Sequence, residues 1–178
     1  MEPEMNRFIA GLALLAALTV FAFVVGSSVE AQQVSNSAKD QVVGTWRLVS
    51  WMEQETATKA VHKLFGDNPL GLLTYTADGR MMVIFTDPNR KAAATRKPTD
   101  AEAAHLFKTM TAYAGTYSVE GNKVIHKIEV SSSQAWNGTS QQRLFEIKDN
   151  RLFLKTPPFM SAFLGKEIIS ELVWERTK

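Results

Sequence analysis

Three tight-turn sequences most constrain how this chain can fold. They are Asp78-Gly79, Gly121-Asn122 and Asp149-Asn150, and strand-like runs flank each of them. Glycine, asparagine and aspartate tolerate the positive φ angles of two-residue hairpins, and at Asp78-Gly79 both turn residues are expected at positive φ. Hairpins repeated along a chain predict antiparallel strands that pair with their neighbours in sequence.

The flanking runs extend this pattern over most of the chain. Eight strands are expected, at Thr45–Trp51, Leu70–Thr76, Met81–Phe85, Thr116–Val119, Lys123–Ser131, Arg143–Lys148, Arg151–Thr156 and Glu167–Arg176. Eight strands joined mostly by sequential hairpins predict an all-β fold, an eight-stranded up-and-down antiparallel barrel.

One helix is expected between the strands. Thr99-Asp100-Ala101-Glu102 has the sequence of a capping box, and apolar residues follow at helical spacing as far as Met110 and Tyr113. The pattern predicts an amphipathic helix of about fourteen residues that packs across the wall or mouth of the barrel. The basic segment Pro88–Pro98 before it is either a solvated loop or a lid over an anionic ligand.

The residues before the first strand predict export. Phe8–Val25 is apolar or small throughout, and Val29 and Ala31 fit the positions that signal peptidase reads. Residues 1–31 are therefore expected to be a signal peptide, 32–41 a flexible lead-in and 42–178 the barrel. The alternative is an N-terminal membrane anchor, because the run is just long enough to span a bilayer. In either case the domain is expected to lie outside the cytoplasm, in the periplasm, secreted or anchored to a membrane. It is expected to contact a membrane only through this segment, and only if the segment is not cleaved.

Composition narrows the chemistry. The chain has no cysteine, which excludes disulfides and thiol catalysis, and its three histidines lack metal-ligand spacing. A net charge of +2, spread along the chain, gives no reason to expect nucleic acid as a partner. No metal and no cofactor are expected.

Strand alternation predicts which side chains point into the barrel. The inward sets are Val124, His126, Ile128 and Val130; Gln141, Arg143, Phe145 and Ile147; and Ile168, Ser170, Leu172, Trp174 and Arg176. The expected turns also set the register. They place Tyr117 opposite His126, Phe145 opposite Leu154 and Ile147 opposite Leu152.

The predicted interior is thus apolar but holds Tyr117, His126, Gln141 and Arg143 on adjacent strands. A buried guanidinium needs a carboxylate, carbonyls, water or a ligand, unless Arg143 lies at the rim with its head in solvent. His126 is either a core histidine bonded to Tyr117 or water, or a functional group. Trp136, in the loop between their strands, either caps the cavity or covers the barrel end.

Several segments resemble a known family. They are Gly44–Ser50, Asn68–Met81, Tyr113–Tyr117, His126 with Glu129-Val130, Trp136–Thr139, Gln141 with Arg143 and Phe145, and Thr156–Pro158. On these, the chain from Val42 to Lys178 is similar to the bacterial and fungal lipocalin-like domain family, calycin-related proteins mostly without assigned functions. Where members often carry two adjacent histidines, this chain has His126-Lys127.

The resemblance implies a barrel with an internal cavity and no particular reaction. It also implies a structural role for Gly44, Trp46 and Arg176. In lipocalins the tryptophan of the first strand plugs the barrel base, and an arginine of the last strand stacks over it.

Two functions fit these residues. The first is an exported protein that binds or carries a small hydrophobic molecule, with Gln141 and Arg143 holding a polar or anionic group and Tyr117, His126 and Trp136 lining the site. The second is a cofactor-independent enzyme, an isomerase, cyclase or hydrolase of a hydrophobic metabolite. In that case His126 is the general base, Tyr117 orients it or donates a proton, and Arg143 stabilises an oxyanion.

Overall fold

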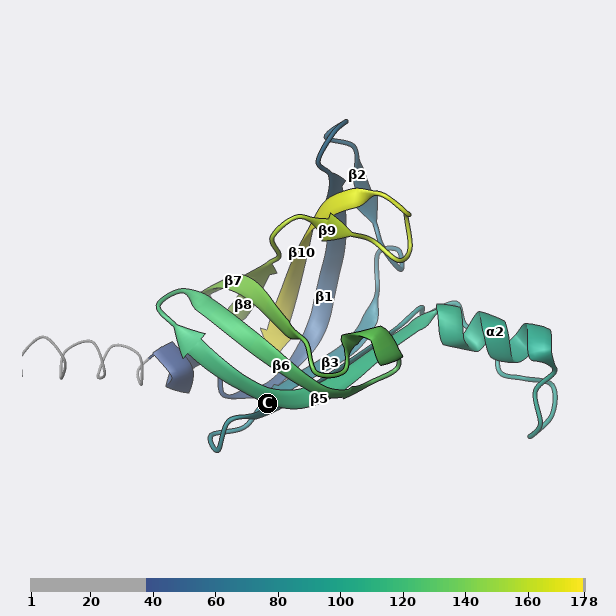
Figure 1. The fold of residues 1–178 in the computed structure, drawn as a ribbon, viewed down its shortest axis with the longest axis horizontal. Coiled ribbons are helices and arrows are strands. Elements are labelled where there is room, and N and C mark those ends of the chain that lie inside the picture. Colours follow the sequence, from purple (N-terminus) through teal and green to yellow (C-terminus); the bar gives the residue numbers. More distant parts are fainter. Residues whose placement is uncertain (1–37, 178) are drawn as a thin grey trace, which may run out of the picture. The chain divides into compact units, whose positions relative to one another are not determined.

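Eight antiparallel strands close into a barrel in the computed structural model, which describes residues 38–177 (Figure 1). Each strand pairs with the next one around the barrel, and the last pairs with the first, as the hairpin pattern predicts. The strands are β1 (Gly44–Glu55), β3 (Leu70–Tyr75), β4 (Arg80–Thr86), β5 (Met110–Glu120), β6 (Lys123–Ser131), β7 (Ser140–Lys148), β8 (Arg151–Lys155) and β10 (Glu167–Arg176).

The two ends of the barrel differ. The hairpin turns 77–79, 121–122 and 149–150 lie at one end, which we call the base, and the longer connections lie at the other, which we call the mouth. The sequence analysis did not predict two short strands at the mouth. β2 (Val61–Lys63) pairs with the end of β1, and β9 (Phe159–Met160) pairs with the start of β10. A single 3-10 turn, η1 (Gln134–Trp136), joins β6 to β7 there.

The expected registers are present. Tyr117 pairs with His126, and both Phe145–Leu154 and Ile147–Leu152 are cross-strand pairs. Asp149 and Asn150 have φ angles of 51° and 60°, as a two-residue turn of this kind requires. At Asp78-Gly79 the prediction was wrong in detail: only Gly79 has positive φ, because Thr76 pairs with Arg80 and leaves a three-residue loop.

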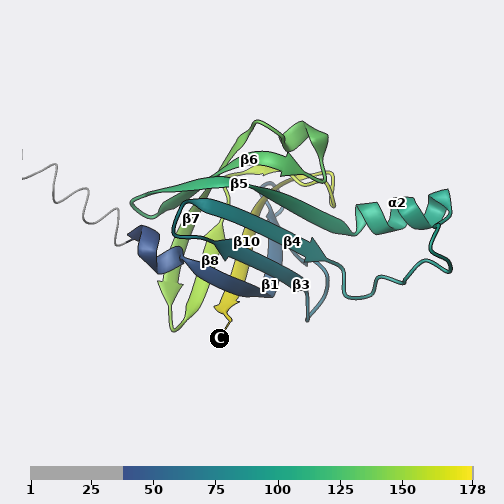
Figure 2. The same ribbon diagram turned by 90° about the horizontal axis from the view of Figure 1, so that it is seen from below.

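The helix α2 (Asp100–Lys108) is shorter than predicted and does not cover the barrel. Thr99 and Glu102 form the expected capping box, but the helix ends at Thr109. Every residue of α2 is exposed or half-buried, and in both views it projects away from the barrel wall (Figure 1 and Figure 2). Met110 and Tyr113 belong instead to β5, where pairing with β4 overrides their helical spacing.

Two β-bulges change which residues face inward. In β1 the register with β10 shifts between Leu48 and Ser50, so Trp46 and Leu48 face the core, followed by Trp51 and Glu53. In β6 the register with β5 shifts between Ile128 and Val130, because Glu129 is an extra residue with no partner position in β5. Val130, expected inside, is therefore 60% exposed, because a shift of one residue turns each following side chain to the other face.

The base of the barrel is plugged by Trp46, which is fully buried. Its Nε1–H donates to the Val42 carbonyl at 2.8 Å, and the Arg176 guanidinium lies 4.1 Å from the ring centre. Arg176 also donates to the carbonyls of Val43 and Gln41. Residues 38–42 form a helical turn, and these bonds join the carbonyl groups at its end to the base of the barrel. A side chain at Gly44 would overlap the Arg176 guanidinium.

The predicted signal peptide or anchor lies outside the described residues. Within residues 38–177, no helix is long and apolar enough to cross a membrane. The same residues contain no group of three or more histidine, cysteine, aspartate or glutamate side chains that could hold a metal ion.

Candidate functional site

A cavity of about 420 Å³ occupies the barrel between the Trp46 plug and the mouth. This volume lies within the range of pockets that hold small organic ligands. Aromatic and aliphatic side chains make up most of the wall, including Trp51, Leu73, Val83, Phe85, Tyr113, Trp136, Leu154, Phe163, Leu172 and Trp174. Polar side chains are few: Glu53, Thr111, His126, Gln141, Gln142, Arg143, Thr156 and Ser170.

His126 is fixed between two tyrosine hydroxyl groups. Its Nε2 lies 2.6 Å from the Tyr75 hydroxyl and its Nδ1 lies 3.2 Å from the Tyr113 hydroxyl. Burial, together with the nearby Arg143 charge, holds the pKa of His126 well below its usual value. Burial also raises the pKa of Tyr75 and of Tyr113, so all three side chains are neutral at pH 7.

The burial of Tyr75 indicates how the protons are arranged. Tyr75 is 1% exposed and does not line the cavity, so its hydroxyl proton is best satisfied by donation to His126 Nε2. His126 Nδ1–H then donates to the Tyr113 oxygen. Tyr113 does line the cavity, and its own hydroxyl proton remains available to an acceptor there.

Arg143 and Gln141 form the second part of this polar group. One guanidinium nitrogen donates to the Gln141 side-chain oxygen at 2.8 Å and another donates to the Gln141 carbonyl at 3.2 Å. The guanidinium carbon lies 5.9 Å from the centre of the Tyr113 ring. Arg143 is half-buried in the cavity wall, so its partial desolvation is offset by these oxygens and by the aromatic ring. We call Tyr113, His126, Gln141 and Arg143 the donor pole.

Trp136 lines the cavity from η1. Its ring meets the Tyr113 ring edge to face, with centres 5.8 Å apart. The loop that follows β6 therefore closes part of the mouth over the donor pole.

Tyr117 does not join this group, contrary to expectation. It pairs with His126 across the two strands, but its hydroxyl donates to the Thr76 carbonyl at 2.9 Å, towards the base. Its ring packs on Tyr75 and is outside the cavity wall. Tyr117 therefore neither orients His126 nor faces a ligand, and Tyr75 and Tyr113 hold the positions expected for it. The basic residues of segment 88–98 are likewise outside the cavity wall, which does not support a lid there.

Glu53 is a cavity residue that the sequence analysis missed, as it also missed Tyr113. It is 1% exposed, and its side chain accepts a hydrogen bond from the Ser161 hydroxyl at 2.6 Å. Burial raises the pKa of this carboxyl group. Ser161 also accepts from the backbone N–H groups of Phe163 and Leu164, so Glu53 is joined to the loop that follows β9.

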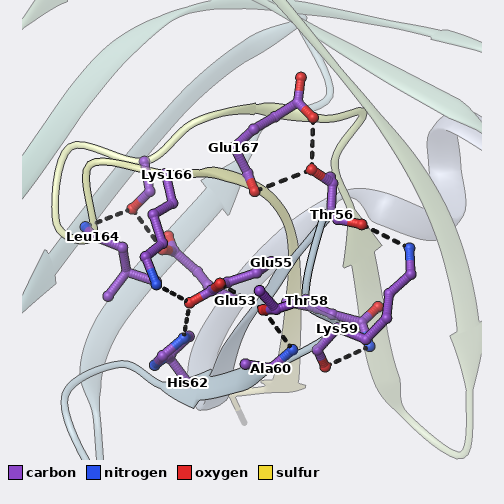
Figure 3. Close-up of polar contacts among 12 residues, drawn as sticks. Glu53, Glu55, Thr56, Thr58, Lys59, Ala60, His62, Leu164, Lys166 and Glu167 are labelled. Atoms are coloured by element: carbon purple, nitrogen blue, oxygen red, sulfur yellow. Dashed lines mark hydrogen bonds and ion pairs between the residues drawn. The ribbon is translucent and has the colours of Figure 1, made fainter.

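The same loop is anchored by an ion pair between Lys166 and Glu55, whose polar contacts are drawn in Figure 3. Glu55 Oε1 lies 2.5 Å from Lys166 Nζ and 2.7 Å from His62 Nε2, while Thr58 donates to Oε2. These partners, Lys166 first, lower the pKa of Glu55 to about 2. Phe163 in this loop packs on Trp51, so the loop forms part of the cavity wall.

Comparison with known proteins identifies the domain. The family model of the lipocalin-like domain matches residues 43–177. A curated relative from Aspergillus oryzae is 35% identical over 88 residues, which is 44% of this chain and 77% of that protein. It is named as a carrier protein of 4'-hydroxy-3'-methoxypropiophenone.

Solved structures of low similarity were also found. A lipocalin-like protein from Bacteroides uniformis has a TM-score of 0.40 at 13% identity, covering 76% of this chain and 98% of its own. An uncharacterised protein from Bacteroides eggerthii has a TM-score of 0.39 at 11% identity, covering 76% and 99%.

Proposed function

Because the chain belongs to the lipocalin-like domain family, we propose that it binds and carries a small hydrophobic molecule in its barrel cavity. The observation that supports this most directly is the cavity itself, about 420 Å³ in volume with a largely apolar wall. The Aspergillus relative is named as a carrier of a substituted phenyl ketone, and a ligand of that size and kind suits an aromatic wall of this type.

The donor pole indicates which part of the ligand is held. Tyr113 and Arg143 offer N–H and O–H groups to the cavity beside apolar surface. A carbonyl or carboxylate oxygen is the ligand group that accepts such bonds. We therefore propose an apolar ligand with an acceptor oxygen at this end.

The enzymatic alternative rests on the contact between His126 and Tyr113 in the cavity. Both ring nitrogens of His126 are engaged by tyrosine hydroxyls, and its pKa is held well below the usual value. A general base needs a free nitrogen within reach of the substrate proton. This geometry favours carrying over catalysis.

Binding can be tested with a neutral naphthylamine probe whose fluorescence rises in apolar surroundings. Val83→Phe adds volume to the cavity wall, so we expect the affinity to fall about tenfold or more. Ile84→Phe is the matched control, because Ile84 is the next residue of β4 and is 42% exposed. Equal affinities in all three proteins, or a wild type that binds no apolar probe, would contradict the proposal.

We also propose that the domain acts outside the cytoplasm. This rests on Phe8–Val25 and on the small residues Val29 and Ala31. Expression in an exporting host followed by N-terminal sequencing should give Gln32 as the first residue. Recovery of the intact chain in a membrane fraction would favour the anchor instead.

A further inference from the structure

Glu53 is a buried carboxylate in the cavity wall that the proposed function leaves without a role. Glu55 lies two residues along β1 and is paired with Lys166 and His62. Glu53 receives one hydrogen bond, from Ser161, among the described residues. Two carboxylates on one strand thus have opposite surroundings. Glu53, which has no cationic partner within residues 38–177, lines the cavity, whereas Glu55 is outside the cavity wall.

Burying a carboxylate such as Glu53 in the wall of an apolar cavity that holds no ligand costs free energy. An ionised carboxylate taken out of water needs several hydrogen bonds or a cation, and a single hydroxyl supplies only part of this. A leucine would suit neighbours such as Trp51 and Phe163 better. Polar groups that burial disfavours are characteristic of binding and active sites.

The cavity's cation does not neutralise Glu53 directly. Among the described residues, Arg143 donates to Gln141 and no ion pair joins it to Glu53, whose one hydrogen bond comes from Ser161. The wall therefore has two separate polar regions, the donor pole and the Glu53 carboxylate. A neutral ligand with one acceptor group and one donor group satisfies both regions without bringing a further charge into the apolar wall.

We propose that Glu53 recognises a hydroxyl group of the ligand by accepting its hydrogen bond. The inference rests on the proposed function and defines the ligand class more narrowly. The ligand is a neutral, largely aromatic molecule with an acceptor oxygen at the donor pole and a hydroxyl group at the Glu53 end. The Ser161 hydroxyl occupies one carboxylate oxygen, and the ligand's hydroxyl donates to the other.

The test compares two benzophenones, one with a para hydroxymethyl group and the other with its methyl ether. Both carry the same carbonyl and stay neutral, and only the alcohol can donate to Glu53. Their affinities are measured on the purified protein by the quenching of Trp51, Trp136 and Trp174, which line the cavity. We expect the alcohol to bind about tenfold more tightly, as for a hydrogen bond to a charged acceptor.

Glu53→Gln keeps the shape of the side chain and removes its charge. The preference for the alcohol should fall to about threefold or less, and the melting temperature should stay the same or rise because a buried charge is gone. Glu55→Gln is the matched control: it removes the same charge from the same strand outside the cavity wall, and the preference should remain. Arg143→Met should weaken both ligands equally.

The outcomes separate this proposal from the carrier function. If the wild type binds both benzophenones with equal affinity, the carrier function stands and the role of Glu53 is wrong. An unchanged preference for the alcohol in Glu53→Gln would also overturn the role of Glu53. A large drop in the melting temperature of Glu53→Gln would overturn it too, because it would show that the bond to Ser161 is purely structural. A wild type that binds neither benzophenone nor the naphthylamine probe contradicts both proposals.

Discussion

At the scale of single residues, His126 is a side chain of the site with hydrogen-bond partners at both ring nitrogens. It is 1% exposed and is held neutral between Tyr75 and Tyr113. The unfolded chain binds a proton at this histidine as the pH falls below about 6.5, and the folded chain does not. Acidification therefore favours the unfolded state.

This gives a stability prediction with a definite sign. Because burial lowers the pKa of His126 in the folded protein, its contribution to stability is complete above pH about 6.5 and is lost as the pH falls. The loss approaches about 1.4 kcal/mol per pH unit below pH about 5.5. Denaturant unfolding of wild type and His126→Gln over this range should show the wild type losing more stability. Parallel curves would mean that His126 is protonated in the fold.

Arg143 allows a second prediction at this scale. Arg143→Met keeps most of the side-chain volume but removes the guanidinium that Gln141 and Tyr113 position. Affinity for benzophenone, which carries an acceptor oxygen, should fall about tenfold, the value of a hydrogen bond from a charged donor. Affinity for diphenylmethane, which lacks the oxygen, should barely change. Equal losses would indicate damaged packing, and no loss would place Arg143 outside the binding site.

At the scale of elements, the β-bulges decide which residues form the site. Alternation counted from Trp46 would turn Glu53 to solvent, and the bulge before Ser50 turns it inward. Regular alternation did place His126, Gln141 and Arg143 at the cavity wall, because β7 and the first part of β6 are regular. The sequence therefore predicted the barrel, the cross-strand pairs at its hairpins, and the position of His126, Gln141 and Arg143 in the cavity wall. It missed Glu53 because a bulge leaves no periodic signal, and Tyr113 because helical spacing continued past Lys108.

Gly115 tests the bulge in β6. A Cβ at this position would overlap the Lys127 carbonyl oxygen, a backbone atom that cannot move without disturbing the pairing of β5 and β6. Gly115→Ala should cost about 2–4 kcal/mol of unfolding free energy, the range for a severe backbone clash. Gly138→Ala is the control: it has a positive φ of 80° but open space around its Cβ, so about 1–2 kcal/mol is expected. Equal costs would show that the strands separate to admit the methyl group.

At the scale of the whole molecule, the residues that close the fold and the loops that surround the proposed binding site lie at opposite ends of the barrel. The base carries Trp46, Arg176 and the short turns, and the mouth carries Trp136 and the loop with Ser161. Loops on a rigid scaffold commonly carry binding, because the strands keep the core independent of loop sequence. Changes at the base should therefore alter folding, and changes at the mouth should alter affinity.

Two tryptophans make this division measurable. Trp46→Ala removes a fully buried ring from the base and should lower the unfolding free energy by about 3–5 kcal/mol. In the fraction that remains folded, the benzophenone affinity should be unchanged, because Trp46 lies outside the cavity wall. Trp136→Ala should do the reverse: the ring is half-buried on Tyr113, so the stability loss is smaller and the affinity falls several-fold. Chemical denaturation and fluorescence titration of both variants check this. If Trp46→Ala weakened binding as much as Trp136→Ala, the cavity would depend on the base plug, and the two ends would not be independent.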